Sequence, residues 1–145
     1  PTPAELAASF DAVLPAIEAV EGRWEEGQNA SATAKLADLQ CHGALVLGPV
    51  AALAPGAVEL RTVQAALWLD GDCVQRTTGG NPAPELWRLI GWLARHCSER
   101  GLPLRRGQIV TTGSCTGLTP VAAGAQVRGE LAGIGSVSLR YGDAG

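Results

Sequence analysis

The chain has 145 residues, which fits one domain, and its formal net charge of −3 at pH 7 argues against a nucleic-acid-binding protein, because such proteins need clustered positive charge. No apolar run approaches the ~20 residues that a membrane span needs. Hydrophobic residues make up 46%, enough for a core, and the 19 glycines and 9 prolines favour a strand-rich fold over a helix bundle.

The N-terminal segment carries a strong helix-start signal. Thr2 can cap the helix, a proline occupies the first helical position, and Glu5 completes a capping box. Apolar residues at helical spacing then predict a helix that ends near residue 14, since Pro15 disfavours helical backbone at the residue before it. The short apolar run over 16–20 predicts a strand, with Glu18 in its middle.

A polar stretch and several strands follow. Residues 22–39 predict a long loop, and unstructured loops of this length are often functional. A buried strand is expected over 43–48, and one or two strands over 58–70. The sequence Asp-Gly-Asp at 70–72 predicts a tight hairpin turn that returns through a strand over 73–77.

The longest helix is predicted over residues 83–100. It has an apolar stripe at helical spacing, and Gly101 is placed to end it. Three further strands are expected, over 109–112, 126–131 and 136–141, and a glycine-rich turn joins the last two.

The four cysteines lie far apart and include no CxxC pair; they are Cys41, Cys73, Cys97 and Cys115. The chain is not small and shows no signal peptide. We therefore expect reduced, mostly buried thiols in a cytoplasmic protein rather than disulfides.

Three ordered sets of segments stand out: residues 15–23 (PAIEAVEGR); residues 37–38 followed by 43–48 (GALVLG); and residues 107–114 (GQIVTTGS) followed by 133–138 (GIGSVS). Each is weak alone, but their order and spacing resemble the hydratase and decarboxylase branch of the fumarylacetoacetate hydrolase superfamily. The resemblance covers essentially the whole chain. It implies one α+β domain over 1–145, with a mixed, curved β-roll and a long helix on its outside.

The resemblance also implies a catabolic enzyme that holds a divalent metal, Mg²⁺ or Mn²⁺, with three carboxylates. The metal would bind the oxygens of a small 2-oxo acid and stabilise, as a Lewis acid, the enolate formed during hydration or decarboxylation. Glu18 falls on the third ligand position. In the family the other two ligands form an ExE pair well upstream of this helix, so the chain resembles the C-terminal part of such an enzyme, with the N-terminal part absent before Pro1.

Glu18 is the expected metal ligand. Burying a glutamate in an apolar strand costs several kcal/mol unless a cation or hydrogen-bond donors compensate, which favours a buried, ligated carboxylate. The alternatives are an exposed strand face and a helix that continues past Pro15.

Asp38 and Lys35 fall in the family's catalytic loop. Asp38 is expected to orient a water or act as a base, and Lys35 to steer the substrate carboxylate. An ordinary loop-capping aspartate and a solvated lysine are the alternatives. The loop departs from the family pattern, because Ala34 and Leu39 replace an aspartate and an asparagine. These changes are compatible with an altered substrate or a lost activity.

Thr112, Gly113 and Ser114 end a predicted strand, at a corner that touches the substrate carboxylate in the family. Backbone N–H groups and the Ser114 hydroxyl would supply the donors; a plain turn is the alternative. Arg23 is expected to serve the substrate site, by pairing with an acid near it, or else to be a surface cation. His42 borders the loop and could face a site; a structural role is the favoured expectation.

Two functions follow from the resemblance. The first is a metal-dependent 2-oxo-acid lyase, in a family that is commonly oligomeric. The second is a non-catalytic subunit that binds and stabilises an active partner, suggested by the changed loop and the missing pair of carboxylates.

Overall fold

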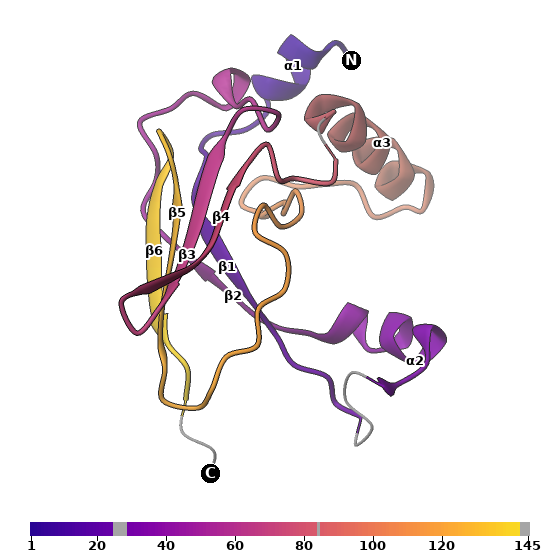
Figure 1. Cartoon of the computed structure of the whole chain (residues 1–145). Helices are drawn as coiled ribbons and strands as arrows, with labels where there is room; N and C mark the ends of the chain where they lie inside the picture. Colours follow the sequence, from indigo (N-terminus) through magenta and orange to yellow (C-terminus); the bar gives the residue numbers. More distant parts are fainter. Residues whose placement is uncertain (25–28, 84, 143–145) are drawn as a thin grey trace.

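The computed structural model describes residues 1–24, 29–83 and 85–142 (Figure 1). The chain forms three α-helices, two 3-10 turns and six strands within these residues. In order they are α1 (Pro3–Ala7), β1 (Ala16–Val20), α2 (Ala32–Ala37), η2 (Leu39–Cys41), β2 (His42–Leu47), η3 (Pro55–Ala57), β3 (Gln64–Leu69), β4 (Asp72–Thr78), α3 (Leu86–Glu99), β5 (Gln126–Leu131) and β6 (Gly135–Arg140).

The strands form two antiparallel sheets. β1 pairs with β2, and the other four strands follow the order β4-β3-β5-β6. The expected mixture of parallel and antiparallel pairs is wrong, because every strand pair among the described residues is antiparallel. Short hairpins join β3 to β4 and β5 to β6, and such connections allow only antiparallel pairing. The combination of helices with antiparallel sheets agrees with the predicted α+β class.

The turn between β3 and β4 confirms the predicted hairpin. Asp70 and Gly71 both have positive φ, 51° and 95°, as the turns that suit a twisted hairpin require. The Asp70 carboxylate also accepts a hydrogen bond of 2.9 Å from the backbone N–H of Gln126. This contact ties the turn to β5.

The two-stranded sheet packs on the inner face of the larger one. Val127 and Val137 are buried on this face. Two glycines mark the close approach: a Cβ on Gly129 would lie 3.2 Å from Ile17, and one on Gly48 would lie 2.7 Å from Pro15. Because successive side chains of a strand point to opposite faces, Ile17 faces the large sheet and the residue after it faces away.

The first helix starts as predicted and ends early. Thr2 and Glu5 form the capping box, but α1 ends at Ala7 instead of near residue 14. The residues after it run toward β1, where the carbonyl groups of Val13 and Pro15 accept hydrogen bonds of 2.8 Å from the N–H groups of residues 51 and 48. Pairing with this neighbouring segment replaces the helical hydrogen bonds.

Helix α3 has 14 residues, so the prediction of a long outer helix is not confirmed. Gly101 ends it as expected, with φ 74°, and the N–H of Leu102 donates to the carbonyl of Cys97. The helix packs on α1 and on the segment that follows it, where the ring of Phe10 lies 6.1 Å from that of Trp87. Of the helix residues, only Ile90 is buried.

Three segments differ from the predictions. The expected loop over 22–39 contains α2, which begins where the Ser31 hydroxyl accepts from the N–H of Ala34. Residues 58–63 and 109–112 are not strands. In the first of these a turn forms, because the N–H of Val63 donates to the carbonyl of Glu59 instead of to a neighbouring strand.

The cysteines are all free, but the prediction of mostly buried thiols is wrong. Cys41 is buried, Cys73 is exposed, and Cys97 and Cys115 are half-buried. Among the described residues, no helix is long and apolar enough to cross a membrane.

Candidate functional site

Glu18 lies on the face of β1 that points away from the four-stranded sheet. Its side chain is 49% exposed, so the expected burial is wrong and the alternative of an exposed strand face holds. The error has a simple cause: the two-stranded sheet is covered on the side of Ile17 and open on the side of Glu18. The carboxylate is therefore accessible to a ligand from solvent.

His42, the first residue of β2, pairs with Glu18. Its Nδ1 lies 2.7 Å from Oε1 of the carboxylate, and its own side chain is 41% exposed. The contact places an imidazole directly beside the predicted metal ligand, so His42 faces the candidate site, which was the alternative to its expected structural role.

Arg23 and Asp38 form a second pair in the same region. The Arg23 backbone N–H donates to Oδ2 of Asp38 at 3.0 Å, and its Nη1 donates to Oδ1 at 2.6 Å. A third bond of 2.9 Å runs from Nη2 to the backbone carbonyl of His42. Arg23 thus pairs with an acid, which was one of the two roles predicted for it. It also links the segment around Asp38 to His42 at the start of β2.

Asp38 is held in a single orientation. Its side chain is only 7% exposed, and the Arg23 backbone N–H, followed by the guanidinium, holds the pKa of this carboxyl below its usual range. It stands between α2 and η2, where Leu39, Gln40 and Cys41 all adopt left-handed backbone, with φ of 53°, 58° and 63°. Each such residue costs about 1–2 kcal/mol, so surrounding contacts must hold this turn.

The Asp38–Arg23 pair predicts a pH-dependent stability. A carboxyl of an unfolded chain titrates near ~3.9. Because the folded-state pKa of Asp38 is lower, its contribution is fully present above that pH and is lost as the pH falls through the folded pKa. We expect urea unfolding of wild type and Asp38→Asn to differ most near neutral pH, with the difference in unfolding free energy shrinking below pH ~4.

Asp11→Asn is the matched control for this experiment. The Asp11 side chain is 76% exposed and 3.6 Å from Arg106, so its removal should change stability little at neutral pH. A difference between wild type and Asp38→Asn that stayed constant into the acid range would contradict the assigned role of Asp38.

Lys35 lies in the last turn of α2, three residues before Asp38, and is half-buried. This position brings it to the region of the Arg23–Asp38 pair. Its expected role toward a substrate carboxylate stays a prediction.

The corner formed by Thr112, Gly113 and Ser114 is held by a residue that the sequence analysis missed. Asn81 is 5% exposed, and its amide nitrogen donates to the carbonyl groups of Thr112 at 2.9 Å and Gly113 at 3.4 Å. Its amide oxygen accepts from the N–H of Ala83. An asparagine within a Gly-Gly-Asn-Pro run predicts a turn, so no local sequence signal indicates that its side chain would hold a distant loop in place.

The corner itself is exposed and turn-like. Gly113 has φ 94°, and the Ser114 hydroxyl donates to the carbonyl of Gly117 at 3.1 Å and accepts from the N–H of Thr116. The chain brings together Glu18, Asp38, Arg23 and His42 in one network, whereas no hydrogen bond or ion pair among the described residues joins them to this corner. In Figure 1, α2, α3 and the orange connection between α3 and β5 lie on the same side of the four-stranded sheet.

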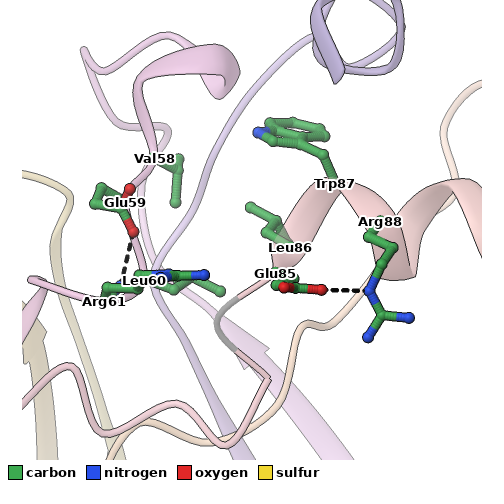
Figure 2. A pocket seen from close by; sticks show the side chains of 8 residues that line it. All are labelled: Val58, Glu59, Leu60, Arg61, Glu85, Leu86, Trp87 and Arg88. Atoms are coloured by element: carbon green, nitrogen blue, oxygen red, sulfur yellow. Dashed lines mark hydrogen bonds and ion pairs between the residues drawn. The ribbon is translucent and has the colours of Figure 1, made fainter. Parts of the chain in front are cut away.

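A cleft of about 390 Å³ lies elsewhere, between residues 58–61 and the start of α3 at 85–88 (Figure 2). Both of its carboxylates are engaged: Glu59 accepts from the backbone N–H of Arg61, and Glu85 pairs with Arg88. It contains none of the predicted site residues. The candidate site is therefore the exposed network around Glu18 and not this cleft.

The donor set decides what cation the network could hold. A carboxylate oxygen is a hard ligand suited to magnesium or manganese, and Glu18 presents one on an accessible face. Over residues 1–24, 29–83 and 85–142, no group of three His, Cys, Asp or Glu side chains is arranged to hold a metal ion. The described part of the chain thus offers a divalent cation one accessible carboxylate, that of Glu18.

Comparisons with known proteins place the chain among related sequences. A 2-keto-4-pentenoate hydratase from Paraburkholderia xenovorans (strain LB400) is 29% identical over 141 residues, 97% of this chain and 52% of that protein. A 4-oxalocrotonate decarboxylase from Pseudomonas putida is 27% identical over 146 residues, 94% of this chain and 51% of that protein. The chain spans about half the length of the curated relatives it matches.

A solved structure shows the same fold. The 4-oxalocrotonate decarboxylase from Pseudomonas putida G7, complexed with magnesium and adipate, superposes with a TM-score of 0.73 at 27% identity, over 96% of this chain and 52% of that one. The model of the fumarylacetoacetate (FAA) hydrolase C-terminal family matches residues 12–140. The resemblance seen in the ordered motifs is thereby confirmed, and the chain belongs to the fumarylacetoacetate hydrolase C-terminal family.

Proposed function

We propose that this chain is part of a divalent-metal-dependent lyase that hydrates or decarboxylates a small 2-oxo acid. The observation that carries the proposal is that Glu18, which the ordered motifs predict as a metal ligand, lies on an open strand face in contact with His42. Relatives that are named as a hydratase and a decarboxylase, and a decarboxylase structure solved with magnesium, support this reaction class. Magnesium or manganese is the proposed cation, and the cytoplasm the proposed location.

Each polar group has a role in the proposal. When bound, the cation would supply Lewis-acid stabilisation of an enolate. Glu18 binds the cation through a carboxylate oxygen. Lys35 attracts the substrate carboxylate from α2, and backbone N–H groups of the Thr112–Ser114 corner are the proposed donors to the same anionic group, since the Ser114 hydroxyl already donates to the carbonyl of Gly117.

Asp38 is better suited to orientation than to proton abstraction. Both of its oxygens accept hydrogen bonds from Arg23, and its lowered pKa makes it a weak base. Within the proposal, Asp38 therefore fixes Arg23 and the strand start at His42, while Arg23 contributes positive charge beside the substrate site. The predicted role of Asp38 as a base stays a prediction.

Calorimetry with manganese, in the presence and absence of oxalate as a 2-oxo-acid mimic, tests the proposal. Oxalate adds two oxygen ligands to the cation, so we expect binding that depends on oxalate and is lost in Glu18→Ala. Glu59→Ala is the matched control, because Glu59 accepts from the N–H of Arg61 near the cleft and lies outside the network. Manganese binding that is equal in wild type and Glu18→Ala would contradict the assignment of Glu18.

A second candidate is a non-catalytic subunit that binds and stabilises an active partner. A compact monomer of 14.9 kDa is expected to expose about 7,000 Å², whereas this chain exposes 9568 Å². The excess is comparable to the area that large permanent interfaces bury. Large apolar side chains contribute to it, since Leu36, Trp92 and Leu102 are 64%, 51% and 73% exposed.

The same calorimetry bears on both candidates. Oxalate-dependent manganese binding supports the lyase, because a purely structural subunit has no reason to retain it. An absence of binding, with the chain folded by circular dichroism, would rule out metal binding by this chain alone and leave either the partner subunit or a piece of a lyase whose other ligands lie on another segment.

A further inference from the structure

We propose that His42 is a positioning residue that fixes the Glu18 carboxylate in its metal-binding orientation. The inference rests on the proposed function above and adds to it a residue that the ordered motifs do not mark. The observation behind it is an irregularity in the pairing of β1 with β2, which turns the His42 side chain toward Glu18.

A β-bulge directs the histidine. The register pairs Ala19 with Ala44 but Val20 with His42, so Gly43 is an extra residue in β2. In an unbroken ladder Val20 would pair with Gly43, and His42 would point to the covered face. The bulge moves His42 to the face shared by Val20 and Glu18, as bulges often do when they re-aim a side chain.

The bulge also requires a glycine. A Cβ on Gly43 would lie 2.9 Å from the carbonyl oxygen of Ala19 and 3.1 Å from Cβ of Glu21. Another residue at this position would push β1 and β2 apart. The glycine thus permits the geometry that brings the imidazole to the carboxylate.

The backbone of His42 is anchored independently of its ring. The guanidinium of Arg23 donates to the His42 carbonyl at 2.9 Å, and the buried Asp38 holds that guanidinium. The imidazole is therefore presented to Glu18 from a fixed strand end, and Nδ1 lies 2.7 Å from Oε1.

Stability alone does not account for this arrangement. The two side chains are 49% and 41% exposed, and ion pairs of such exposure contribute little to folding. Orientation is the larger effect, because an exposed glutamate otherwise samples several rotamers. With Nδ1–H donating to Oε1, the carboxylate is held by one oxygen and can offer the other to a cation, as carboxylate ligands in metal sites are themselves hydrogen-bonded.

The test compares the affinity of three variants for Mn²⁺ in the presence of oxalate. Electron paramagnetic resonance of the free Mn²⁺ ion measures this affinity. His42→Ala removes the donor and should weaken binding about 10–100-fold, the usual effect of losing a partner that orients a ligand. His42→Asn places an amide N–H close to the position of Nδ1 and should restore the affinity to within about threefold of wild type, as one retained hydrogen bond predicts. His96→Ala is the control, since His96 stacks on Trp92 in α3 and should bind as wild type does.

Each outcome decides the inference. Wild-type affinity in His42→Ala would overturn the positioning role while leaving the metal proposal intact. Equally weak binding in His42→Asn and His42→Ala would also overturn it, because the imidazole itself would then be required. If wild type takes up no manganese with oxalate, this chain alone holds no metal ion, and the inference fails.

Discussion

Gly79→Ala should lower the unfolding free energy by about 2–5 kcal/mol, the largest effect that we expect from a single methyl group in this chain. Gly79 has φ 61°, where a side chain costs about 1–2 kcal/mol. Its added Cβ would lie 2.1 Å from the carbonyl oxygen of Arg61, a backbone atom that cannot rotate aside, and overpacking of this kind costs a further 1–3 kcal/mol or so.

The position matters for the candidate site as well. Gly79 follows β4 and lies two residues before Asn81. Its N–H donates to the carbonyl of Val63. A displaced Gly79 would therefore shift the amide that holds the Thr112–Ser114 corner. Urea unfolding followed by circular dichroism measures the loss of stability.

Gly117→Ala separates the two contributions. Gly117 has φ 73°, close to that of Gly79, but nothing lies within 4 Å of its Cβ position. In this control the unfolding free energy should fall only by the cost of a side chain on left-handed backbone, about 1–2 kcal/mol. Equal losses in the two variants would show that the contact with Arg61 is not as close as described.

Gly48→Ala should separate the two sheets and cost about 1–3 kcal/mol. The new Cβ would lie 2.7 Å from Cγ of Pro15, 2.8 Å from the carbonyl oxygen of Ser136 and 3.1 Å from Cβ of Val137. Gly48 also donates its N–H to the carbonyl of Pro15 at 2.8 Å, so it cannot move without losing this bond. Because β1 carries Glu18, the substitution should also weaken oxalate-dependent manganese binding.

Gly142→Ala is the matched control for Gly48→Ala. No heavy atom lies within 4 Å of its Cβ position, and its backbone is not left-handed. Its unfolding free energy should stay within about 0.5 kcal/mol of wild type, as is usual for surface changes. If Gly48→Ala were as stable as this control, the sheets could not meet at Gly48 as described.

The sequence by itself determined the elements whose signals are local. The capping box at Thr2 and Glu5, the Asp70–Gly71 turn and the end of α3 at Gly101 each depend on a few adjacent residues, and all three are present. The strand with Glu18 was likewise predicted, from a short apolar run. Ordered motifs also identified the family, because they report ancestry directly.

Only the tertiary structure decided how the site residues meet. Alternation along β1 shows that Ile17 and Glu18 face opposite ways, but not which face is covered, so the expected burial of Glu18 was wrong. The pairs Arg23–Asp38 and Glu18–His42 join residues 15 and 24 positions apart, and Asn81 reaches a loop 31 positions away. Hydrogen bonds between such distant positions depend on strand register, a bulge and packed glycines, and these arise only when the two sheets pack together.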